Sequence, residues 1–358
     1  GNIDGAVADL RIVLSNRPDS EQALTLQAKA NDLKGEQEVA ESQWRKILQI
    51  YPNNRLALKQ VINSLQKRGD YEQAEKVLFK AVQLHPKAID LIELQIKLNL
   101  AKKDPESALE VVSKLEAIQN TELVTVYWQG VIAALQGKNI EAIKKYKSVL
   151  KAQPENSQVL NSLAQVYEKI GHRNDFVTYL SNLASNNPET NSALKMLGLI
   201  YQQDKKWQQA ESVIHEALQN NPDEIELKLE LLNIVEQQNT LRAEIILKEW
   251  LQAYPNELRL KLALADLYTK QKRYTESDIL FKEIVNVAPQ SVEGLLAQVK
   301  LAELAWIKND AKTALALLEK TIEQSPWYNN ALTMRASIFL AQKSYSAAEI
   351  DLKRVLEN

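Results

Sequence analysis

The sequence predicts an all-α fold, an α-α superhelix (solenoid) of antiparallel helix pairs stacked along the chain. A proline recurs every 33 or 34 residues, apart from one interval of 37 and one of 68 that Asn120 divides in two. An alanine stands 12 residues before most of these prolines, and a glycine recurs at one fixed position in four of the repeats. The three ladders are Pro18, Pro52, Pro86, Pro154, Pro188, Pro222, Pro255, Pro289 and Pro326; Ala40, Ala74, Ala108, Ala142, Ala210, Ala243, Ala314 and Ala348; and Gly35, Gly69, Gly137 and Gly171. A fixed period of this length indicates a repeat architecture.

The unit Arg55–Ala88 shows how each repeat forms its first helix, called helix A. Leu58, Ile62 and Leu65 recur at helical spacing, which gives this helix one apolar face. Gly69 ends the helix, because glycine accepts the left-handed backbone conformation that follows a helix C-terminus.

The second helix of the unit, helix B, is expected over Tyr71–Leu84. Asp70 can cap its first amide groups, and Pro86 stops it. Ala74 and Ala81 lie on its apolar face, where small side chains let the two helices approach closely. Since neither helix can bury its apolar face alone, each pair needs a neighbour on both sides.

These residues resemble the pattern of the tetratricopeptide repeat (TPR) family. With Arg55 as position 1, that family favours large apolar residues at positions 4, 7, 11 and 24, small ones at 8, 20 and 27, an aromatic at 17 and proline at 32. The best-fitting unit, Asn191–Glu224, has Leu194, Leu197, Gly198, Tyr201, Trp207, Ala210, Ala217 and Pro222. The resemblance covers the whole chain and implies a right-handed superhelix whose A helices line a concave groove.

In this register the chain is a single TPR solenoid over residues 1–358. Residues 1–20 are a half repeat with helix B only, and repeats start at residues 21, 55, 89, 123, 157, 191, 225, 258, 292 and 329. Both ends would expose repeat faces without a polar cap. We therefore expect a fragment of a longer protein, or end-to-end self-association of two copies.

Three repeats depart from the pattern. In the unit starting at 89, Lys103 replaces the glycine and Pro105 follows Asp104, an arrangement that helix starts accept. In the unit starting at 157, Phe176 stands where others have alanine, so its two helices must separate or shift register. The unit starting at 292 has three extra residues in helix A or its turn, near Trp306. Repacking without a function is the simplest interpretation of each.

Composition argues against several classes of function. With 44 Lys and Arg against 46 Asp and Glu, the net charge of −2 offers no basic stripe for nucleic acid. The chain has no cysteine and no apolar run long enough to span a membrane. Its histidines, His85, His172 and His215, are isolated, and no phosphate-binding, nucleophile or metal motif is present. We expect no catalytic residue, no cofactor, no metal and no membrane insertion.

Helix A offers a surface of its own to a partner. Positions 2, 5, 9 and 12 form one stripe, distinct from the stripe that packs on helix B. Lys59 and Asn63 lie on it and resemble part of the carboxylate clamp with which some TPR co-chaperones hold the C-terminal carboxylate of a peptide. The clamp also needs an asparagine and two basic residues where this chain has Leu94, Val124 and Trp128, so a solvated pair is the alternative.

The stripe becomes apolar in the next two units, where most other units carry polar residues. The apolar residues are Leu100, Val124, Tyr127, Val131 and Ala134. Such a patch is a candidate for binding a peptide or helix, and tighter packing or a covering segment is the alternative. We expect Tyr127→Ala with Val131→Asp to weaken partner capture and to leave melting unchanged. In the following unit, Asn161 and Gln165 are suited to an extended peptide backbone, or are ordinary surface of a soluble groove.

These surfaces predict a non-enzymatic scaffold or adaptor that binds a peptide or helix of a protein partner in its groove. The runs GNIDGAVADLRIVL and VYWQGVIAALQGKNIEAI resemble bacterial envelope TPR proteins of exopolysaccharide export and PEP-CTERM (exosortase) systems. That resemblance implies a bacterial envelope assembly or export system and favours the periplasm or envelope over the cytoplasm. The alternative is a non-catalytic, substrate-recruiting TPR region of a larger enzyme, such as a glycosyltransferase or a sensor kinase. The net charge disfavours RNA binding.

Overall fold

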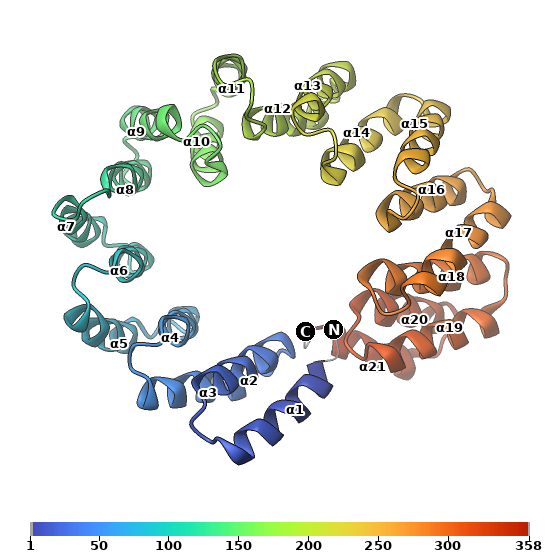
Figure 1. Ribbon diagram of the computed structural model, residues 1–358, viewed down its shortest axis with the longest axis horizontal. Helices are drawn as coiled ribbons and strands as arrows, with labels where there is room; N and C mark the ends of the chain where they lie inside the picture. The colour runs from blue at the N-terminus through green and yellow to red at the C-terminus, as the bar shows by residue number, and fades with distance from the viewer. Residues whose placement is uncertain (1–2, 357–358) are drawn as a thin grey trace. The chain divides into compact units, whose positions relative to one another are not determined.

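The computed structural model describes residues 3–356, which form 21 α-helices and no strand (Figure 1). Gly1 and Asn2 of the expected half repeat, and Glu357 and Asn358 of the expected last repeat, lie outside the described residues. The A helices are α2 (Glu21–Leu33), α4 (Arg55–Lys67), α6 (Ile89–Ala101), α8 (Glu122–Leu135), α10 (Ser157–Lys169), α12 (Ser192–Gln203), α14 (Ile225–Gln238), α16 (Leu258–Lys270), α18 (Val292–Ile307) and α20 (Asn329–Ala341). The B helices are α1 (Ile3–Asn16), α3 (Gln37–Ile50), α5 (Tyr71–Leu84), α7 (Pro105–Glu116), α9 (Asn139–Ala152), α11 (Arg173–Asn186), α13 (Trp207–Asn220), α15 (Thr240–Ala253), α17 (Tyr274–Val287), α19 (Ala311–Gln324) and α21 (Tyr345–Leu356). The predicted all-α class of paired helices is confirmed.

The described chain divides into two compact units. One comprises Leu10–Lys29 and Gln37–Pro222; the other comprises the described residues up to Asp9, Ala30–Glu36 and the described residues from Asp223. The helices α3 to α13 therefore belong to the first unit, and α14 to α21 belong to the second. A single solenoid over the whole chain stays a prediction. Every candidate site residue lies in the first unit.

Within the first unit, the helices form two layers (Figure 1). The A helices α4 to α12 form its inner layer, where α4 packs on α6, α8 on α10 and α10 on α12. Each of these A helices also packs against the B helix before it and the B helix after it. The ladder alanines of this unit have no exposed surface: Ala40, Ala74, Ala108, Ala142 and Ala210. Their small side chains allow the close helix contacts on which the stack depends.

The turn from helix A to helix B keeps one backbone conformation with or without glycine. Gly69 has a φ of 75° and Lys103 a φ of 61°. In both turns the amide of the following residue donates a hydrogen bond to a carbonyl near the end of helix A. Asp70 donates to the Leu65 carbonyl at 2.9 Å, and Asp104 donates to the Asn99 carbonyl at 3.0 Å. Four more residues hold the same place with φ between 57° and 61°: Lys205, Lys272, Asn309 and Lys343. The stacked repeats impose this turn on residues that disfavour it by about 1 kcal/mol or more.

The two irregular spacings have simple structural causes. Asn239 alone connects α14 to α15, so the residue of the left-handed turn is missing from a repeat whose prolines are 33 residues apart. The helix α18 has 16 residues, whereas α16 has 13. The three extra residues therefore lengthen helix A, in the region predicted around Trp306.

Phe176 separates the helices of its repeat, as its bulk predicts. The side chain is 3% exposed and stacks on Tyr167 with ring centroids 5.3 Å apart. As a result, α10 and α11 pack less closely than α8 with α9 or α12 with α13. A hollow of about 350 Å³ lies between α10, α11 and α12 beside the Phe176 ring.

Candidate functional site

The structure places the predicted apolar stripe on α6 and α8. Leu100, Val124, Tyr127 and Val131 are each half-buried, and all four pack against a core cluster built from α6, α7 and α8. Packing therefore accounts for one side of each residue, while the remaining side faces solvent. We call these four residues the apolar strip.

Tyr127 is the most constrained member of the apolar strip. Its ring meets Trp128 edge-on with centroids 5.2 Å apart and lies 6.1 Å from the ring of Tyr146. Its hydroxyl accepts a hydrogen bond from Nε2 of Gln158, on α10, at 2.7 Å. Contacts with two A helices and a B helix hold the exposed part of this side chain in one orientation.

Charged groups border the apolar strip on the α6 side. Trp128 Nε1 donates a hydrogen bond to Glu93 Oε1 at 3.0 Å, and Lys97 Nζ lies 5.7 Å from the centre of the Trp128 ring.

Burial, with a smaller contribution from Tyr127, raises the pKa of Tyr146 to about 12. The Tyr146 hydroxyl therefore stays protonated to a higher pH than that of an exposed tyrosine, and its ring lies beside Tyr127.

The polar candidates flank the apolar strip on neighbouring A helices. On α4, which packs on α6, Lys59 is exposed and Asn63 is half-buried. On α10, which packs on α8, Asn161 and Gln165 are both exposed. The A-helix face thus changes from polar on α4 to apolar on α6 and α8, and back to polar on α10.

The structure adds no residue to the carboxylate clamp. Leu94 and Trp128 are only 8% and 4% exposed, and Val124 packs on the core cluster of α6, α7 and α8. Leu94 belongs to the core cluster that α2 to α6 form, Trp128 belongs to the cluster of α6, α7 and α8, and the indole donor of Trp128 is already bound to Glu93. Lys59 and Asn63 therefore match only part of the clamp, because core residues occupy its remaining positions.

No metal-binding geometry accompanies the apolar strip. Among residues 3–356, no three His, Cys, Asp or Glu side chains are placed to hold an ion. His172 contacts Asp175 at 2.7 Å on an exposed helix start, and His215 lies 3.7 Å from Glu211. Within the same described range, no helix is both long enough and apolar enough to cross a membrane.

Among the hollows outside the predicted surface, two lie beside an aromatic residue that departs from the repeat pattern. One is the hollow beside Phe176, in the repeat whose helices were expected to separate or shift register. The other is a groove of about 690 Å³ between the B helices α3 and α5, which the sequence reasoning missed. The available signal was Phe79, an aromatic residue at a helix B position that is polar in the other repeats.

Comparison with known proteins finds a partial match to a family model and similarity to solved structures. Residues 204–348 match a family model described as the tetratricopeptide repeat protein 21 ARM repeat. The structure of Naa15/Naa10 bound to HypK-THB aligns with 98% of this chain, at 14% identity and a TM-score of 0.38, and the chain spans 60% of that protein's length. Yeast Tom70 aligns over 93% of this chain and 91% of its own, at 12% identity and a TM-score of 0.43. A tetratricopeptide repeat protein from Parabacteroides merdae ATCC 43184 aligns over 84% and 91%, at 21% identity and a TM-score of 0.34.

No curated protein sequence matches the chain. The family match covers the C-terminal repeats, and the same register and helix pairs continue through the repeats before it. Folds of this kind typically serve as protein-interaction scaffolds and are generally non-catalytic. Over residues 204–348 the chain is therefore similar to tetratricopeptide repeat proteins.

Proposed function

We propose that this protein is a non-enzymatic scaffold that binds a peptide or helix of a protein partner on the A-helix face of α4 to α10. One observation carries the proposal. The apolar strip of Leu100, Val124, Tyr127 and Val131 is partly accessible and lies between polar helices, where most other repeats present polar side chains. Apolar patches with a polar rim commonly mark protein interaction sites.

The arrangement favours an apolar anchor on the partner, flanked by polar contacts. An apolar side chain docked on Tyr127 and Val131 would gain about 25 cal/mol for each Å² of apolar surface removed from water. The exposed amides of Asn161 and Gln165 suit a peptide backbone, and Lys59 suits a carboxylate. Since Tyr127 is already held by Gln158, its docked orientation costs little conformational entropy.

The packing of the apolar strip changes which variants give a clean test. Tyr127 and Val131 both contact the core cluster, so Tyr127→Ala with Val131→Asp should lower the melting temperature as well as partner capture. This revises the expectation of unchanged melting that the sequence alone suggested. Exposed positions on α10 avoid the problem, because their side chains contribute nothing to the core.

A photo-crosslinking amino acid at Gln165 tests the proposal directly. The matched control carries the same amino acid at Ser113, which is exposed on the B helix α7. We expect a protein partner from the native cell to crosslink through Gln165 and not through Ser113, and Tyr127→Ala to reduce that crosslinking. Equal crosslinking at both positions, or crosslinking through Ser113 alone, would count against the A-helix face.

The place of this protein in a bacterial envelope assembly or export system is supported by the sequence resemblance alone. Fractionation of the native cell tests it, since recovery with the cytoplasm would contradict the periplasmic or envelope location.

End-to-end self-association predicts a sedimentation coefficient that rises with protein concentration. With a net charge of −2, we expect no salt-dependent binding of single-stranded RNA.

A further inference from the structure

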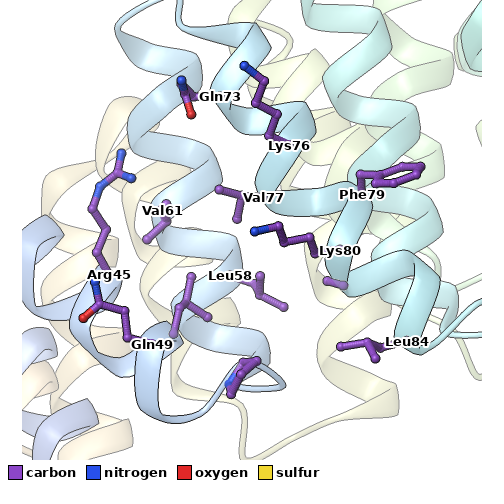
Figure 2. A pocket seen from close by; sticks show the side chains of 13 residues that line it. Arg45, Gln49, Leu58, Val61, Gln73, Lys76, Val77, Phe79, Lys80 and Leu84 are labelled. Carbon is purple, nitrogen blue, oxygen red and sulfur yellow. The ribbon is translucent and has the colours of Figure 1, made fainter.

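The B helices carry a second surface, the groove between α3 and α5 (Figure 2). Leu58 and Val61 of α4 form its floor, and Val77 and Leu84 of α5 line one wall. The groove has a volume of about 690 Å³. It uses a different face of α4 from Lys59 and Asn63, so it is separate from the surface proposed above.

Phe79 stands at the edge of this groove. Its side chain is 60% exposed, and it also lines a smaller hollow of about 370 Å³ between α5 and α6. Every other repeat has a polar residue at the corresponding position of helix B: Arg11, Arg45, Ser113, Lys147, Ser181, His215, Lys248, Lys282, Glu319 and Lys353. Repeat packing therefore does not require an apolar residue here. An exposed phenyl ring beside an apolar groove instead indicates a contact with a partner.

The groove also carries an excess of positive charge. The basic side chains that line it are Arg45, Lys76 and Lys80, and no acidic side chain does so. Glu41 is shared between Arg45 and Arg68, Lys76 pairs with Glu72 at 2.6 Å, and Lys80 has no ion-pair partner among the described residues. Lys80 is therefore a basic side chain of the lining whose charge no ion pair among the described residues offsets. Charge complementarity therefore favours an acidic occupant.

We propose that this groove is a second docking surface, for an amphipathic helix of a protein partner whose acidic residues flank its apolar stripe. A helix suits the groove because α3 and α5, with 14 residues each, border an apolar floor, as in helix-in-groove recognition. The apolar stripe would bury Phe79 and Leu84, which are 60% and 61% exposed. Acidic residues on its flank would meet Lys76 and Lys80, which lie one helical turn apart on α5.

A displayed library of helical peptides of about 18 residues, roughly 27 Å long as helices, provides the probe. The library is selected on the whole chain and counter-selected on the double variant Phe79→Ser with Lys80→Glu. Both side chains are exposed, so the variant should retain its fold, which circular dichroism and melting check. The control variant is His215→Ser, which changes the same repeat position on α13.

We expect the selected peptides to be acidic and to have apolar residues at helical spacing. Their affinity should fall about tenfold or more in the double variant, stay unchanged in His215→Ser and weaken as salt is added. Selected peptides that are neutral or basic, or that ignore both substitutions, would overturn the proposal. So would a dimer of the protein alone that dissociates in the double variant during sedimentation, since the occupant would then be a second copy of this chain.

Discussion

Replacing Glu41 with glutamine should show how strongly one buried carboxylate joins two repeats. The Glu41 side chain is 10% exposed and accepts hydrogen bonds from Arg45 Nε at 2.9 Å, Arg68 Nη2 at 2.7 Å and Ser64 Oγ at 2.5 Å. Glu41 belongs to α3, whereas Ser64 and Arg68 belong to the next repeat. Glutamine keeps the size of the side chain and removes its charge.

The expected loss follows from the electrostatics of this carboxylate. The hydrogen bond from Arg68 outweighs the effect of burial and lowers the pKa of Glu41 from 4.5 to about 2. At about 1.4 kcal/mol for each pKa unit, the contribution to stability is at most about 3.5 kcal/mol. The side chains of Arg45 and Arg68 are 42% and 53% exposed, so water screens part of this interaction. We therefore expect Glu41→Gln to lower the free energy of unfolding by about 2 kcal/mol at pH 7.

Urea denaturation, combined with hydrogen exchange of α3 and α4 amides, measures this change. Because the folded-state pKa lies below the unfolded value of 4.5, the stabilisation is complete above that pH and disappears as the pH falls towards 2. The variant should therefore have a flatter pH dependence in this window. Glu38→Gln, an exposed position on the same helix, is the control. A loss below about 0.5 kcal/mol, or an equal loss in the control, would refute the reasoning.

Three further substitutions test other features of the fold. A Cβ atom at Gly294 would lie 1.8 Å from the Ala288 carbonyl oxygen, so Gly294→Ala should lower the free energy of unfolding in urea by about 2 kcal/mol; an unchanged midpoint would contradict this. Lys103→Gly relieves a left-handed backbone, so it should raise the urea midpoint and increase the free energy of unfolding by about 0.5 kcal/mol. A decrease would show that the lysine contributes other contacts. Phe176→Ala removes a buried ring beside Tyr167 and should cost about 3 kcal/mol in thermal unfolding, and a smaller effect than that of Phe176→Leu would argue against the packing described.

Much of the fold could be predicted because its signals are local. Helix B was expected over Tyr71–Leu84, and α5 has these bounds, with the Asp70 carboxylate accepting from the Gln73 amide as predicted for a cap.

The site was less predictable. Helical spacing places Tyr127 and Val131 on one stripe, but their half-burial depends on the bulk of side chains that another helix contributes. Since helical spacing does not determine this exposure, the binding of a partner to the stripe stays a prediction.

By itself the sequence determined the all-α class, the repeat period and the alternation of helices A and B, since these depend on apolar spacing, caps and prolines within one unit. Only the tertiary structure decided that Lys103 adopts the backbone conformation of Gly69, that Tyr127 is held by Gln158, and that a cationic groove lies between α3 and α5. The last two of these features depend on contacts between residues of different helices. Such contacts are set when neighbouring repeats stack, and no spacing within a single repeat encodes them.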